Sequence, residues 1–117
     1  MKKLLLLVLA LTLALPLAFA QQSMQITGTI IDHQCAGTQT PAELTEFVKT
    51  HTKECALMAS CAASGYAIFA GGKLQDFNAV SSAKVKDFLE KNDSKLQVVV
   101  EANMTDKGLD LISIKNQ

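Results

Sequence analysis

Both histidines and all three cysteines of the chain fall within residues 33–61, and these side chains could do chemistry. They are His33, Cys35, His51, Cys55 and Cys61. Thiolate sulfurs and imidazole nitrogens are ligands that zinc and copper prefer, and two thiols can also form a disulfide. The segment therefore predicts a metal site, a disulfide or a reactive thiol.

The spacing within the second half of this segment indicates a metal site. His51 and Cys55 stand at i and i+4, and Met58 follows at i+7. On one helix the side chains of His51 and Met58 would lie within about 20° of each other. Cys35 could add a second thiolate from outside that helix. This mixture of thioether, thiolate and imidazole ligands suits copper(I) better than zinc.

A second ligand set results when Cys61 replaces Met58. It is a Cys₃His set, typical of zinc, made of Cys35, His51, Cys55 and Cys61. His33, which lies two residues before Cys35, is the reserve ligand.

Structural roles without metal stay open for several of these residues. His51 continues the apolar helical face of Leu44, Phe47 and Val48, and a methionine such as Met58 more often fills a core than binds metal. Asp32, directly before His33, could orient a histidine or cap a turn, and the pattern favours the turn.

Cysteines of an exported protein are expected to form disulfides, and an odd number leaves one thiol over. On an unbroken helix Cys55 and Cys61 would lie about 9 Å apart along the axis and point about 120° apart, too far for a bond. Cys35 could pair with either, and chain entropy does not choose between them. We favour Cys35–Cys61, because it leaves Cys55 near an expected helix N-terminus, where a thiolate is stabilised.

The N-terminal residues predict export. Lys2 and Lys3 precede an apolar run over residues 4–15, and Ala18-Phe19-Ala20 matches a small-residue cleavage pattern. This is typical of a secretory signal peptide over residues 1–20, cleaved after Ala20. Residues 21–117 would then form a single periplasmic or secreted domain without a membrane span.

Hydrophobic periodicity and helix caps predict the elements that must position the cluster. Apolar and polar residues alternate over residues 24–31, which indicates a strand. Thr40-Pro41-Ala42-Glu43 predicts a helix start with a capping box and a proline at the first position. A second helix start is expected at Thr52, and the Ala-rich residues 56–63 favour helix.

The second half of the chain predicts four strands and a helix. Gly71-Gly72 separates two short apolar segments and indicates a tight hairpin. The remaining elements are expected as follows: strands over residues 66–70 and 73–77, a helix from Ser81 or Ser82 to near Asn92, and strands over 96–104 and 109–115 joined by a turn at 105–108.

Apart from the Cys-bearing segment, the order strand, strand, strand, helix, strand, strand is that of a five-stranded OB barrel. The segment itself reads Gly28-Thr29-Ile30-Ile31-Asp32-His33-Gln34-Cys35, then His51-Thr52-Lys53-Glu54-Cys55 and Cys61. On these motifs the chain resembles small exported OB-like domains of bacteria, in which a Gly-x-Ile-x-Asp-x-x-Cys stretch precedes a His- and Cys-bearing helix. The resemblance spans nearly all of residues 24–115 and brings no activity with it.

The predicted fold is accordingly mainly β with two or three helices. It is an OB-like five-stranded barrel with a Cys-bearing helical insert, residues 32–64, between strands 1 and 2.

Charge and composition narrow the function. The chain has 11 basic and 11 acidic residues and no arginine. Nucleic-acid binding needs a basic stripe, so we expect no nucleic-acid partner. We expect a non-enzymatic exported module that binds copper or zinc or presents a thiol. One alternative is a disulfide-stapled domain that binds a protein or glycan. The other is a thiol-redox protein, which the absence of a Cys-x-x-Cys motif disfavours.

Overall fold

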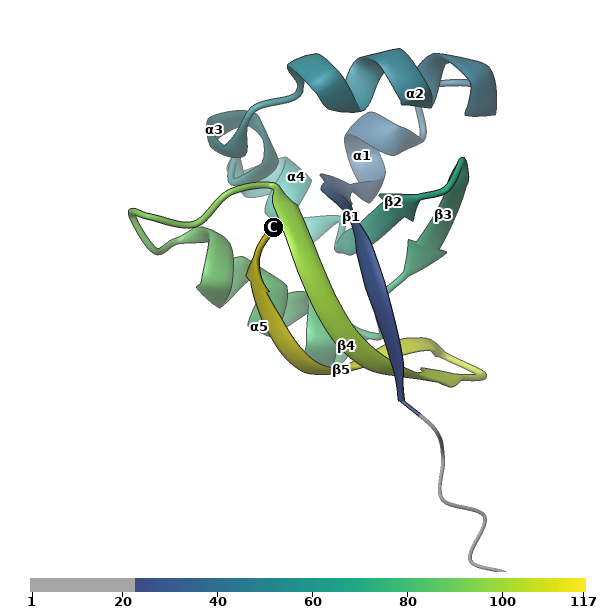
Figure 1. Cartoon of the computed structure of the whole chain (residues 1–117). Coiled ribbons are helices and arrows are strands. Elements are labelled where there is room, and N and C mark those ends of the chain that lie inside the picture. The colour runs from purple at the N-terminus through teal and green to yellow at the C-terminus, as the bar shows by residue number, and fades with distance from the viewer. Residues whose placement is uncertain (1–22) are drawn as a thin grey trace, which may run out of the picture.

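The computed structural model describes residues 23–117, so the expected signal peptide and its cleavage after Ala20 lie outside the described residues. Within residues 23–117 no helix has the length and apolar character to cross a membrane. The elements follow one another as β1 (Met24–Asp32), α1 (His33–Ala36), α2 (Pro41–Thr50), α3 (Lys53–Ala56), α4 (Ala59–Ala63), β2 (Tyr66–Ala70), β3 (Lys73–Asp76), α5 (Ala79–Leu89), β4 (Gln97–Thr105) and β5 (Gly108–Asn116) (Figure 1).

The five strands form one antiparallel sheet in the order β3-β2-β1-β4-β5. The first part of β1 pairs with β4, and its last four residues pair with β2, so that Ile26 faces Val100 and Ile30 faces Ile68. Gly28 lies near the change of partner, where any side chain would collide with the Phe69 carbonyl oxygen. The fold is therefore mainly β, with β1 at its centre.

The sheet is open, and the closed OB-like barrel is not confirmed. Within residues 23–117 no ladder joins the two edge strands, β3 and β5, and one isolated parallel bridge joins Phe77, the residue after β3, to Leu109. The Asn78 N–H extends this contact by donating to the Leu109 carbonyl at 2.9 Å. The chain then leaves the edge because Asn78 caps α5, accepting a hydrogen bond from the Ser81 N–H at 2.8 Å.

Residues 23–117 form five helices in place of the expected two or three. The predicted capping box is confirmed, with Thr40 and Glu43 bonded to each other's backbone and Pro41 at the first position. The Gly71-Gly72 hairpin is confirmed as well, and both glycines have positive φ, 57° and 76°. The start of α5 was predicted too late: Ser81 is buried inside the fold, where its hydroxyl accepts a hydrogen bond from the Leu111 N–H at 2.8 Å.

The helices α1 to α4 form the predicted insert between β1 and β2, and they gather beside the end of β1 (Figure 1). Successive residues of β1 face opposite sides: Ile30 belongs to the core that includes α5, and Ile31 packs with α1 and α2. Both isoleucines are fully buried. The next residue, Asp32, is therefore delivered into the interior with no exposed surface.

Candidate metal site

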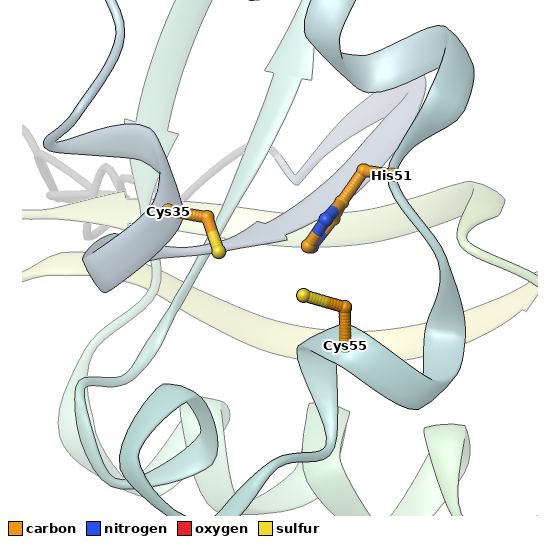
Figure 2. Close-up of side chains that lie close together, drawn as sticks. All are labelled: Cys35, His51 and Cys55. Atoms are coloured by element: carbon orange, nitrogen blue, oxygen red, sulfur yellow. The ribbon is translucent and has the colours of Figure 1, made fainter.

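Three of the predicted ligands come together beside the end of β1. The ligand atoms of Cys35, His51 and Cys55 all lie within 4.8 Å of one another. Figure 2 shows the two thiols and the imidazole converging from separate segments of the chain. A tetrahedral zinc ion has bonds of about 2.3 Å to sulfur and about 2.0 Å to nitrogen, so small side-chain movements would bring these atoms into coordination range.

Local capping places each of the two thiols. The Asp32 side chain caps α1 by accepting a hydrogen bond from the Cys35 N–H at 2.9 Å. The Thr52 hydroxyl caps α3 in the same way, accepting from the Cys55 N–H at 3.2 Å. Each cysteine is thus the third residue of a one-turn helix, and its position is set by the residue three places before it.

His51 ends α2 and turns its ring inward. Its N–H still bonds to the Phe47 carbonyl at 3.0 Å, but its ψ of 137° is extended, so the helix ends there. The imidazole stacks on the Phe47 ring with 5.1 Å between centroids. Only 2% of the His51 side chain is exposed.

A carboxylate orients this histidine. His51 Nε2 lies 3.0 Å from Asp32 Oδ1, and both side chains are buried. With Nε2 donating to the carboxylate, Nδ1 carries the free lone pair and is the nitrogen available to a metal ion. Metal-binding histidines commonly donate their second nitrogen to a carboxylate in this manner.

Helix α3 is fixed to the rest of the fold at both ends. The Tyr66 hydroxyl donates to the Ala56 carbonyl at 2.7 Å. The Lys53 ammonium donates to the carbonyl oxygens of Lys91 and Ser94, each at 2.9 Å, beyond the C-terminus of α5. These contacts hold Cys55 opposite α1.

Cys61 lies in a second group that shares one member with the first. The ligand atoms of Asp32, Cys35 and Cys61 also lie within 4.8 Å of one another. Cys61 is not in the group of His51 and Cys55, so the four residues of the predicted Cys₃His set do not all lie within 4.8 Å of one another. Asp32 and Cys61 are buried, and Cys35 is partly buried.

The surroundings of the thiols favour their protonated form. The pKa of Cys35 is raised from 9.0 to about 12, first by burial, then by the hydrogen bond and charge of Asp32, and after these by Cys55. Burial and Asp32 also raise the pKa of Cys61. At neutral pH both are thiols, and a bound metal ion would have to displace their protons.

The predicted Cys35–Cys61 disulfide is not formed. Cys35, Cys55 and Cys61 are all free. A carboxylate oxygen of Asp32 lies within 4.8 Å of the sulfurs of both Cys35 and Cys61, and Asp32 contributes to the raised pKa of both thiols.

The single helix assumed for His51, Cys55 and Met58 is wrong. The chain leaves helical geometry at His51 and again at Met58, whose ψ is 143°. Met58 is 58% exposed and lies outside both ligand groups. His51 and Cys55 nevertheless meet, because Thr52 starts a new helix directly after the break.

The reserve ligand His33 is engaged elsewhere. Its Nδ1 lies 2.8 Å from the Ser64 carbonyl oxygen, and its Nε2 lies 2.9 Å from Asp76 Oδ1. Each ring nitrogen therefore has an oxygen partner within hydrogen-bond distance. His33 links α1 to the end of α4 and to β3, and it lies outside both ligand groups.

Sequence reasoning treated Asp32 as either a turn cap or a partner of histidine, and it does both. Its place beside the thiols of Cys35 and Cys61 was missed. The sequence did carry one signal, because Asp32 stands three residues before Cys35. At this spacing an N-cap aspartate accepts a hydrogen bond from the backbone N–H of the cysteine.

No family model, no curated protein and no solved structure matches this chain.

Proposed function

We propose that this protein is an exported, non-enzymatic module that binds a zinc or copper(I) ion through Cys35, His51 and Cys55. The supporting observation is the convergence of the three ligand atoms within 4.8 Å, from three different segments, next to a buried Asp32–His51 pair. A packed core histidine needs only one hydrogen bond, and two thiols beside it add the donors of a metal centre.

The donor set suits these two ions. Two thiolates and one neutral imidazole carry a charge of about −2, which a zinc ion neutralises in a site that is mostly removed from water. Copper(I) accepts the same soft donors in a three-coordinate arrangement. Oxygen-seeking ions such as magnesium would find no carboxylate in this first group of ligands.

A thiol-redox role receives less support. A reactive cysteine attacks as a thiolate with a lowered pKa, whereas the pKa of Cys35 and of Cys61 is raised. The proposed role of these cysteines is therefore metal binding.

We also propose that the sheet belongs to the OB-like class as a partly open barrel. Two observations support this proposal. The strand order β3-β2-β1-β4-β5 places β1 between β2 and β4, and the edges β3 and β5 approach each other in parallel at Phe77 and Leu109. An OB barrel is a partly open five-stranded barrel.

The test is a metal titration of the purified chain, with zinc or copper(I) in competition with a chromophoric chelator. We expect the wild type to bind metal, and His51→Ala and Cys55→Ser each to weaken binding of the first equivalent by at least about 10-fold. Met58→Leu is the matched control, because it removes a sulfur three residues from Cys55 that lies outside the site. Wild-type affinity in both ligand variants would refute the site.

Export is tested separately by fractionating cells that express the full chain. We expect the protein outside the cytoplasm with Gln21 at its N-terminus. Accumulation of the uncut chain in the cytoplasm would contradict this part of the proposal.

A further inference from the structure

We propose that the site holds two metal ions, with Asp32, Cys35 and Cys61 binding the second and the Cys35 sulfur bridging the pair. This inference rests on the proposed metal-binding function and extends it. Cys61 and Asp32 are otherwise a buried thiol and a buried carboxylate that the first ion does not use.

The geometry comprises two triads joined at one atom. The first is Cys35, His51 and Cys55, and the second is Asp32, Cys35 and Cys61. Within each triad all ligand atoms lie within 4.8 Å of one another, and the Cys35 sulfur belongs to both. A thiolate sulfur has enough lone pairs to bind two ions at once.

The two triads do not merge into one four-ligand site. Cys61 is absent from the group of His51 and Cys55, so its sulfur lies more than 4.8 Å from the ligand atom of at least one of those two residues. A second ion bound by Asp32, Cys35 and Cys61 would use the two ligands that the first ion leaves free. Neither triad would have to change its arrangement.

Asp32 retains free acceptor capacity for an ion. Its Oδ2 accepts from the Cys35 N–H and its Oδ1 from His51 Nε2. Each carboxylate oxygen has two lone-pair sites, so one on each oxygen is left when the thiols of Cys35 and Cys61 lose their protons to metal. Asp32 can therefore bind the second ion while it orients the ligand of the first.

Charge balance favours a pair of divalent ions. Three thiolates and one carboxylate together carry four negative charges, and His51 is neutral as a ligand. Burying uncompensated charge is costly, and a second divalent ion brings the fully deprotonated cluster to neutrality.

The experiment is a cobalt(II) titration of the wild-type protein under anaerobic, reducing conditions, read by native mass spectrometry, absorption and electron paramagnetic resonance. We expect two equivalents to bind. The resonance signal should grow with the first equivalent and shrink with the second, because two high-spin ions that share a thiolate couple antiferromagnetically.

Cys61→Ser should bind one equivalent and keep its resonance signal at excess cobalt. Ser113→Ala, at an exposed serine of β5 that lies outside both ligand groups, is the control and should still bind two. The wild-type titration decides the question even where the Cys61 variant fails to fold.

The remaining outcomes separate the two proposals. One equivalent in the wild type, with Cys61→Ser unchanged, would overturn the second ion and leave the first site standing. One equivalent that Cys61→Ser weakens would make Cys61 a fourth ligand of a single ion, which also overturns the pair. No bound cobalt in the wild type would refute both.

Discussion

Asp32 is the residue on which the geometry of the site depends most. One carboxylate caps α1 through the Cys35 N–H and bonds to His51 Nε2, and it has no exposed surface. One buried side chain thus caps a helix, bonds to a histidine and raises the pKa of two thiols. Changing its charge should alter both metal affinity and thiol chemistry.

Asp32→Asn tests this role while keeping the size of the side chain. We expect affinity for the first metal equivalent to fall by about 10- to 100-fold, because the histidine loses its carboxylate partner. The pKa of Cys35 and of Cys61 should fall as well, since Asp32 raises both. Alkylation of the metal-free protein by iodoacetamide at pH 8 should therefore become faster.

The matched control for this variant is Asp76→Asn, which removes the carboxylate from the exposed His33 pair. It should change neither the metal affinity nor the alkylation rate. Equal behaviour of the two variants would argue against a special role for Asp32.

The raised pKa values of Cys35 and Tyr66 predict a loss of stability at alkaline pH. Cys35 titrates near 9.0 when unfolded and at about 12 when folded, and Tyr66 shifts from 10.0 to about 12 because it is buried and near Asp32. A folded pKa above the unfolded one means that the stabilisation is present below the unfolded pKa. It is lost as the pH rises toward the folded pKa.

The free energy of unfolding of the metal-free protein should therefore decrease between about pH 9 and pH 12. Urea denaturation at a series of pH values measures it. In Tyr66→Phe the free energy of unfolding should be lower by about 1 kcal/mol at every pH, because the hydrogen bond to Ala56 is missing. Its further decrease with rising pH should be smaller than in the wild type. A flat profile from pH 9 upward in the wild type would contradict the prediction.

At the scale of elements, the break between α2 and α3 shapes the site. A continuous helix through residues 51–58 would hold His51, Cys55 and Met58 on one face, as the spacing suggested. The extended backbone at His51 and the new cap at Thr52 instead turn the imidazole and the Cys55 thiol toward α1. Cys35 can reach both for this reason.

Thr52→Ala tests the cap that starts α3. We expect a loss of about 1 kcal/mol in the free energy of unfolding, together with weaker binding of the first metal equivalent, because Cys55 lies in the one-turn helix that this cap begins. Thr40→Ala is the matched comparison, since it removes the cap of α2 at the end far from His51. It should cost similar stability and affect metal affinity less. Urea denaturation and chelator competition measure the two quantities.

At the scale of the whole molecule, the site brings strand β1 into contact with helical segments that are not part of the sheet. The end of β1, the α2–α3 junction and α4 all contribute groups to the cluster. A metal ion that binds only the folded chain adds stability in proportion to its saturation. Because a single bridge joins the edges of the open sheet, metal binding can add to the free energy of unfolding.

Metal should therefore raise the melting temperature of the wild type. At a free metal concentration about 100 times the dissociation constant, the gain is about 2.7 kcal/mol. Calorimetry with zinc and with chelator measures it, and Cys55→Ser should show a much smaller difference. Equal melting temperatures of the wild type with and without metal would contradict the prediction.

Local patterns in the sequence were sufficient for most of the elements. Alternation predicted β1, Gly71-Gly72 predicted the hairpin, and the Thr40 capping box predicted α2. These signals act over a few residues, so they need no knowledge of the rest of the chain. The Asn78 cap of α5 was missed because two serines nearby offered the same chemistry.

The sequence by itself determined that the cysteine and histidine side chains suited to metal lie in an insert between two strands, but it did not identify Asp32 as a candidate ligand. Only the tertiary structure decided how they group. Cys35 meets His51 and Cys55 across 16 and 20 residues of chain, and their separation depends on how α1, α2 and α3 pack at the end of β1. The free thiols and the burial of Asp32 have the same origin, because burial and long-range contact are properties of the packed chain rather than of any short segment.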